Sequence, residues 1–113
     1  MSGNIDWSSL STAATKAAAA KAELQSTFEA QVQSHLDAAA KAGGYDNIMT
    51  AVSYADEPSV AKFQADGKAF RAWRSQVWAY AYQALADVNA GTRETPTLEA
   101  FIAELPPLEV SIT

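Results

Sequence analysis

The feature that most constrains the fold of this chain is an unbroken stretch over residues 10–42 that contains neither glycine nor proline. Alanine, the residue with the highest helix propensity, dominates its first half. Larger apolar residues then recur at every fourth position, at Leu24, Phe28, Val32 and Leu36. This spacing places one apolar stripe along a helix. Gly43 and Gly44 end the pattern, because glycine adopts a left-handed backbone without strain. The sequence therefore predicts a helix over about residues 8–42.

The predicted helix is too long for a compact domain. At 1.5 Å per residue it measures about 50 Å, whereas a compact domain of 113 residues is only about 35 Å across. The helix must therefore break, project from the domain, or pair with another chain. An alanine-rich stripe forms a weak core by itself, and close contact with another helix, as in a coiled coil, is its natural use.

Capping residues and stops predict three further helices. Asp46 caps a short helix that ends near 56, Pro58 suits the first turn of the next helix, and Thr95-Pro96 opens the last one. The predicted spans are 46–56, 59–90 and 96–105. We expect an all-α fold: one elongated helical bundle over 1–113, made of the long N-terminal helix, a helical core over 44–105 and a short extended tail over 106–113. The end of that tail alternates apolar and polar residues, as a strand does.

The helix predicted over 59–90 is apolar on several sides, which is typical of a helix surrounded by protein. One stripe comprises Phe63, Gly67, Phe70, Val77, Ala81 and Val88. Gly67 is costly inside a helix, by about 1 kcal/mol relative to alanine, so it indicates a close approach of another backbone. The rest of the chain has too few large side chains to cover every side. We therefore expect a homo-oligomer, a dimer or trimer paired along its helices.

Composition excludes several kinds of site. The chain lacks cysteine, which removes disulfides, thiolate metal sites and a cysteine nucleophile. Its one histidine, His35, has no local pattern of nucleophile and carboxylate around it, so we interpret it as structural or solvated. No phosphate-loop or dinucleotide motif is present. We expect no enzymatic activity, no metal and no cofactor.

The sequence contains no obvious targeting or membrane segment. The first charged residue is Asp6, and no apolar stretch of signal-peptide type precedes the first lysine, Lys16. The longest apolar stretch without charge, over 75–86, is shorter than the roughly 20 residues that a membrane span requires. We expect a soluble protein that remains in the cytoplasm where it is made and does not contact a membrane.

Aromatic and arginine side chains concentrate on the third predicted helix, and these residue types carry most of the energy of protein interfaces. The candidate partner-binding residues are Phe70, Arg71, Trp73, Arg74, Trp78, Tyr80 and Tyr82. Positions 73, 77 and 80 share one side of the helix, and 74, 78, 82 and 85 share another. One side should bury in the bundle and the other should meet a partner. Buried Arg74 would need a carboxylate, for which Glu94, Glu99 and Glu104 are candidates.

The same helix offers an alternative function. Lys62, Lys68, Arg71 and Arg74, opposed by Asp66, give this segment a local charge of +3 beside aromatic residues. Basic and aromatic side chains together bind single-stranded nucleic acid. The whole chain has a net charge of −5, which makes nucleic acid an unlikely partner. Residues 87–113 carry five acids and one arginine, so we favour attraction between the basic helix and this acidic segment.

The motifs of residues 44–105 resemble small proteins encoded in the tail modules of tailed bacteriophages and prophages, beside tail-fibre genes. GYDNIMTAVSYA matches their GYD turn, and KFQADGKAFRAWRSQVWAYAY contains their F-x-A-[DE]-G-x-A-F and WR-x-x-VW-x-Y segments. PTLEAFIAELP matches their P-T-x-E-x-x-x-x-ELP end. The match covers about half of the chain by motif, and the run from Trp73 to Tyr82 is its most specific part.

This resemblance implies a setting for the protein. It predicts a virion tail component or a tail-fibre assembly factor that acts by protein–protein interaction. Its partners would be other copies of itself and another phage tail or tail-fibre protein. The location it implies is the cytoplasm of the bacterial host during assembly, and the virion tail for a structural component.

Overall fold

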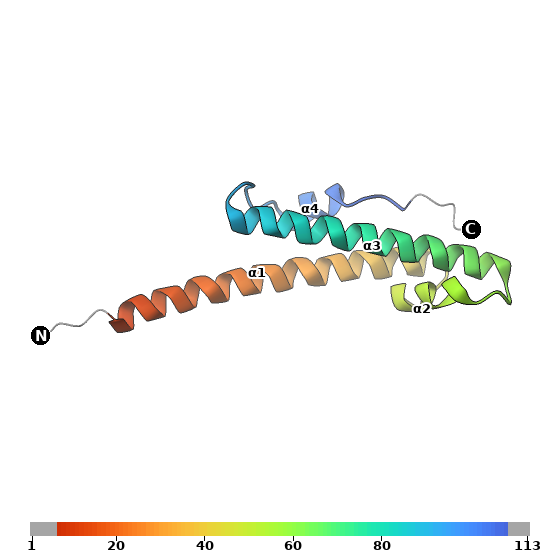
Figure 1. The fold of residues 1–113 in the computed structure, drawn as a ribbon, viewed down its shortest axis with the longest axis horizontal. Coiled ribbons are helices and arrows are strands. Elements are labelled where there is room, and N and C mark those ends of the chain that lie inside the picture. Colours follow the sequence, from red (N-terminus) through yellow and green to blue (C-terminus); the bar gives the residue numbers. More distant parts are fainter. Residues whose placement is uncertain (1–6, 109–113) are drawn as a thin grey trace, which may run out of the picture.

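The computed structural model describes the backbone of residues 7–108 and the side chains of Lys16 and of residues 18–108 (Figure 1). Within this range the elements are α1 (Trp7–Ala42), α2 (Ile48–Ser53), the 3₁₀ turn η1 (Tyr54–Asp56), α3 (Ala61–Ala90) and α4 (Leu98–Glu104). The described part contains helices and no strand, which confirms the all-α fold. The molecule is elongated, with extents of 75 × 23 × 18 Å. The predicted extended tail begins as expected after α4, but residues 109–113 lie outside the described range.

Helix α1 does not break, and it projects from the bundle. Its C-terminal half contributes Phe28, Val32, Leu36 and Ala40 to the core, all essentially inaccessible to solvent. Leu24 is half-buried, and the side chains described between Lys16 and Glu23 are exposed. Figure 1 shows this N-terminal part of α1 extending beyond the ends of α3 and α4. The apolar stripe predicted from the fourfold spacing is therefore the packing face, and the described side chains before Leu24 lie outside it.

The turn after α1 reverses the chain as the two glycines predicted. Gly44 has φ of +94°, and the amide of Tyr45 donates to the carbonyl of Ala40 at 2.9 Å, which closes the helix end. The predicted cap of α2 was wrong by one residue. Asn47 performs this role, because its side-chain oxygen accepts from the amide of Thr50 at 2.8 Å.

Two other predicted helix starts lie two residues too early. Pro58 and Ser59 form a turn, and α3 starts only at Ala61. Helix α4 starts at Leu98 because Thr97, rather than Thr95, accepts a hydrogen bond from the amide of Ala100 at 3.1 Å. In both places the proline lies in the connection and not in the first helical turn. The connection that contains Pro96 thereby becomes part of the surface where α1, α3 and α4 meet.

Gly67 lies where another backbone approaches α3 closely, as its position inside a helix predicted. It is buried on α3, and a Cβ atom placed on it would lie 2.5 Å from the backbone nitrogen of Ala55 and 2.9 Å from the carbonyl oxygen of Ala51. Only glycine allows α3 to approach α2 and η1 this closely. The contact fixes the short α2–η1 segment against the first half of α3.

Helix α3 forms the centre of the bundle. Its buried residues are Asp66, Gly67, Phe70, Trp73, Val77, Ala81 and Ala84. These face α1 on one side and α2, η1 or α4 on others. Phe28 of α1 and Phe101 of α4 meet edge to face, with ring centroids 4.8 Å apart, so α4 closes the core near the C-terminal end of α3. None of the described helices is both long enough and apolar enough to cross a membrane.

Candidate interaction surface on α3

The side of α3 that contains Phe70, Trp73 and Val77 faces the protein's own core. Phe70 and Val77 are fully buried, and Trp73 is 4% exposed. The Trp73 indole nitrogen donates to the carbonyl of Pro106 at 2.7 Å, which ties the chain after α4 to α3. Phe70 and Trp73 were expected to contact a partner, and this arrangement corrects that expectation, because both side chains are enclosed by residues of the same chain.

Tyr80 also belongs to the side of α3 that holds α4. Its hydroxyl donates to Glu104 at 2.6 Å, and Arg93 pairs with the other oxygen of the same carboxylate. These two contacts lower the pKa of Glu104, with the larger effect from Arg93, and the same carboxylate raises the pKa of Tyr80. Tyr80, one of the candidate partner-binding residues, therefore makes an intramolecular contact, on the same side of α3 as Trp73 and Val77.

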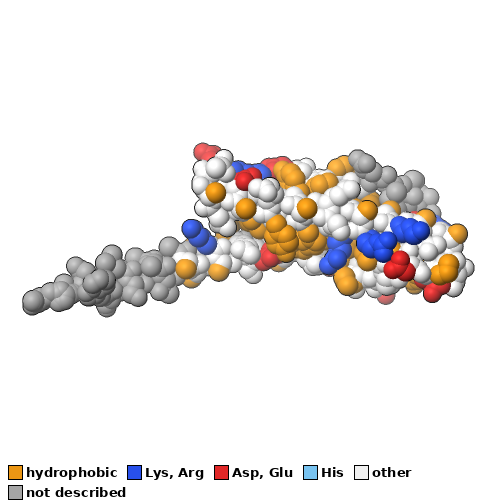
Figure 2. All heavy atoms as spheres, viewed as in Figure 1, with side chains coloured by type: hydrophobic (Ala, Val, Ile, Leu, Met, Phe, Trp, Pro, Cys, Tyr) orange, Lys and Arg blue, Asp and Glu red, His pale blue; other side chains and the backbone are white. Residues whose placement is uncertain are grey.

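The remaining side of α3 carries an aromatic pair beside an arginine. Trp78 and Tyr82 stack with ring centroids 5.4 Å apart and an interplanar angle of 26°. Trp78 is partly buried against the core, whereas Tyr82 is 52% exposed. One turn earlier lies Arg74, whose Nε atom is buried without a hydrogen-bond partner. Figure 2 shows hydrophobic side chains gathered near the middle of the bundle, next to Lys and Arg side chains. We refer to Arg74, Trp78 and Tyr82 as the α3 surface.

The carboxylate expected to pair with Arg74 is used elsewhere. Glu104 contacts Arg93 and Tyr80, and Glu94 and Glu99 are exposed. An arginine nitrogen that is buried and unpaired costs free energy unless a ligand or partner satisfies it. Arg74 is half-buried and is the one charged group of the α3 surface, so its guanidinium is the group there that can donate to a carboxylate or carbonyl from outside.

The basic cluster predicted on α3 is partly neutralised by nearby acids. Lys62 contacts Asp66 at 2.7 Å, and Arg71 contacts Asp56 of η1 at 3.3 Å. Neither ion pair involves the acidic segment over 87–113. Lys62 and Arg71 therefore do not make the expected contact with that segment. Lys68 is exposed on the same half of α3.

Sequence reasoning missed Tyr45 as a structural centre. Its ring lies against those of Tyr54, Phe63 and Phe70, with centroids 5.8, 6.3 and 5.9 Å away. Its hydroxyl donates to the buried carboxylate of Asp66 at 2.8 Å. The signal available in the sequence was the GYD turn, which places an aromatic residue directly after the end of α1. The cluster joins the turn, η1 and α3.

This cluster predicts a loss of stability in alkaline solution. Burial, followed by the hydrogen bond to Asp66, raises the pKa of Tyr45 from 10.0 to about 12. A raised pKa in the folded state means that the stabilising contribution is complete below pH 10 and is lost as the pH rises through about 12. We expect Tyr45→Phe to reduce this pH dependence, measured as the free energy of unfolding in urea between pH 8 and 11.5. Tyr82→Phe, which removes an exposed hydroxyl, is the control and should retain the wild-type profile. If Tyr45→Phe has the same pH profile of unfolding free energy as the wild type, the alkaline loss of stability does not come from Tyr45.

His35 lies next to Trp73, with ring centroids 5.6 Å apart, and partial burial lowers its pKa. This packing is the environment of a structural side chain. Among the residues described, no group of three or more histidine, aspartate or glutamate side chains is arranged to hold a metal ion.

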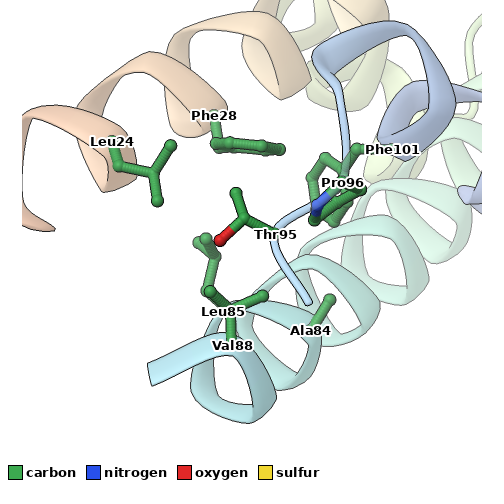
Figure 3. Close-up of a pocket in the computed structure, with 8 residues that line it drawn as sticks. All are labelled: Leu24, Phe28, Ala84, Leu85, Val88, Thr95, Pro96 and Phe101. Carbon is green, nitrogen blue, oxygen red and sulfur yellow. The ribbon is translucent and has the colours of Figure 1, made fainter. Parts of the chain in front are cut away.

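A second surface feature lies where α1 leaves the bundle. Figure 3 shows Leu24 and Phe28 of α1 facing Leu85 and Val88 of α3, with Thr95 and Pro96 of the connection beside them. On the outer side of this cluster is an open groove of about 400 Å³. Its lining residues are Ala20, Glu23, Leu24, Thr27, Phe28, Pro96 and Leu98.

Comparison with known proteins leaves the fold and the two surface features as the basis for assigning a function. No family model matches the chain, and no curated protein or solved structure matches it. What the geometry establishes is an elongated all-α protein with an arginine–aromatic surface on α3 and an apolar groove at the base of its projecting helix.

Proposed function

We propose that this chain is a phage or prophage tail-associated protein that acts by protein–protein interaction, as a tail component or a tail-fibre assembly factor. The observation that carries the proposal is the stacked Trp78–Tyr82 pair beside the unpaired Nε of Arg74. Tryptophan, tyrosine and arginine are the residues most enriched at the energetic centres of interfaces. The similarity of residues 44–105 to tail-module proteins supports the setting.

The chemistry of the α3 surface defines the partner group it suits. A planar aromatic pair packs against an apolar or aromatic side chain, and the arginine beside it donates hydrogen bonds to a carboxylate or a backbone carbonyl. We therefore propose that the partner presents an apolar residue next to such an oxygen.

Binding of single-stranded nucleic acid is the less favoured alternative. Lys62 and Arg71 each face a carboxylate of the same chain, which reduces the positive potential available to phosphates. The net charge of the chain is −5, so its long-range field opposes a polyanion. Titration of a labelled single-stranded oligonucleotide at low and high salt tests this alternative directly.

The test of the main proposal replaces Tyr82 by a photo-crosslinking amino acid in bacterial cells that assemble the tail. Met49 of α2, which is 57% exposed, is the matched position for the control. We expect crosslinks from position 82 to a tail or tail-fibre protein and none from position 49. Recovery of the chain in purified particles identifies a tail component, and its absence from particles despite the crosslink identifies an assembly factor.

Substitution of the same residue gives a second measurement. We expect Tyr82→Ala to weaken binding to the crosslinked partner about tenfold or more, because truncation of an interfacial tyrosine removes much of its contact area. Met49→Ala should bind as the wild type does. Both variants should melt close to the wild type, since both side chains are more than half exposed. Unchanged binding by Tyr82→Ala, or crosslinks only to nucleic acid, would reject the α3 surface as a protein-binding site.

A further inference from the structure

The groove at the base of the projecting part of α1 has an apolar floor and two parts. Its outer part is open, with a volume of about 400 Å³. Its inner part, between Leu24, Phe28 and Phe101 (Figure 3), has a volume of about 10 Å³, close to the least that one water molecule needs. The inner part is therefore closed to side chains, and the outer groove is where an apolar side chain of a partner can be buried.

One side of the groove is a regular helix face. Ala20, Leu24 and Thr27 of α1 are spaced four and three residues apart, so they share one face of the helix. Pro96 and Leu98 border the groove on the other side. The α1 side chains described before Leu24 are exposed, and Figure 1 shows α1 continuing outward past the groove. A second helix can therefore lie along α1 and place an apolar side chain in the groove, which is a common mode of helix recognition.

Exposed acids border the groove on each of the elements that form it. Glu23 of α1 lines it, and Glu94 and Glu99 directly precede and follow two further lining residues, Thr95 and Leu98. All three carboxylates are exposed. The ion pairs formed among the described residues include none of them. These carboxylates are therefore available to a cation from outside.

The negative charge is not balanced by nearby cations. Residues 84–104 carry four acids and one arginine, a net charge of −3, and that arginine, Arg93, already contacts Glu104. On α1, the two lysines and two glutamates between 16 and 29 balance each other. Helix α3 also ends here, at Ala90, with no basic residue in its last turn. The partial negative charge of a helix C-terminus favours a cation as well.

We propose that this groove binds a basic amphipathic helix of another protein. An apolar side chain such as leucine enters the groove, and lysine or arginine residues beside it meet Glu23, Glu94 and Glu99, because complementary charge selects the partner. The α3 surface offers a guanidinium to an oxygen, whereas the groove offers carboxylates to a cation. The two surfaces thus select partners of opposite charge, and the chain can join them. The groove does not depend on the function proposed for the α3 surface.

A second copy of this chain is a less suitable occupant of the groove. The exposed apolar side chain that it offers beside a lysine is Phe63, which is 39% exposed and follows Lys62. Lys62 is already paired with Asp66 of its own chain at 2.7 Å, so it brings no free cation to the groove. We therefore assign the groove to a different protein, and self-association becomes one outcome of the test.

Labelled peptides of about 18 residues, long enough to form a helix, test the chemistry of the partner. The first peptide has leucines on one side and lysines on the other. Glutamates replace the lysines in the second, and glutamines replace the leucines in the third. Fluorescence anisotropy measures the dissociation constants. We expect the leucine–lysine peptide to bind the full chain about tenfold more tightly than either of the others. Equally tight binding of the second peptide or of the third overturns the proposal.

Two variants locate the binding on the chain. Thr27→Arg places a cation in the groove, whereas Ser26→Arg places the same charge on the neighbouring exposed residue, which does not line the groove. We expect Thr27→Arg to raise the dissociation constant of the leucine–lysine peptide about tenfold and Ser26→Arg to change it less than about twofold. Both variants should melt close to the wild type, since both side chains are exposed. Equal effects of the two variants on binding overturn the proposal.

Sedimentation of the chain without peptide tests the alternative occupant. We expect the wild type and Thr27→Arg to have the same oligomeric state. A dimer of the wild type that Thr27→Arg abolishes and Ser26→Arg retains would mean that a second copy fills the groove, which overturns the proposal. Tyr82→Ala, on the α3 surface, should bind the leucine–lysine peptide as the wild type does. Failure of one surface is therefore distinguishable from failure of the other.

Discussion

Phe70→Ala is expected to lower the free energy of unfolding by about 3–5 kcal/mol, the usual cost of removing a fully buried phenylalanine. Phe70 is inaccessible to solvent and packs against the rings of Tyr45 and Trp73, with centroids 5.9 and 6.3 Å away. The cavity would lie where α3 packs against Tyr45 in the turn after α1, next to the hydrogen bond from Trp73 to Pro106. For a chain of this size the loss corresponds to a melting temperature lower by about 10–20 °C.

The control for this prediction is Tyr82→Ala, on the same helix. Tyr82 is 52% exposed, so its truncation should change the free energy of unfolding by no more than about 0.5 kcal/mol. Thermal and urea unfolding, followed by circular dichroism, compare the two variants. Equal effects of both substitutions would contradict the division of α3 into a core side and an exposed side.

Gly67→Ala is expected to destabilise the protein, although alanine normally stabilises a helix interior relative to glycine by about 1 kcal/mol. The added Cβ would lie 2.5 Å from the backbone nitrogen of Ala55 and 2.8 Å from the carbonyl carbon of Tyr54. Both atoms belong to the backbone, so η1 must move away from α3. Overpacking of this kind costs about 1–3 kcal/mol, which exceeds the gain in helix propensity.

The displacement should be visible in the cluster around Tyr45. Tyr54 and Phe63 lie near it in a tilted contact, with ring centroids 5.3 Å apart, and the near-ultraviolet circular dichroism of these rings reports their packing. Gln76→Ala, at an exposed position of α3, is the matched control for the change in helix propensity. We expect the control to keep or slightly raise the melting temperature. A melting temperature raised by Gly67→Ala would mean that the two backbones are not in close contact.

The sequence by itself determined the features that depend on neighbours along the chain. The fourfold spacing of Phe28, Val32 and Leu36 identified the buried stripe of α1, because residues four apart lie on one face of a helix. The glycines after residue 42 located the end of α1, and Gly91, with φ of +78°, closes α3 in the same way. The cost of a glycine inside a helix also predicted the close approach at Gly67.

The tertiary structure decided which side of each helix is used. Trp73, Trp78 and Tyr82 are all large aromatic residues, but only Trp73 is buried, and the carbonyl of Pro106, 33 residues later, accepts its hydrogen bond. Likewise, Glu104 contacts Arg93 and Tyr80 rather than Arg74, because α4 docks near the C-terminal end of α3. Helical periodicity states which residues share a face, but the neighbour of that face is set by contacts distant in sequence. For the same reason, the length of α1 alone could not distinguish a broken helix from a continuous one that extends beyond the ends of α3 and α4.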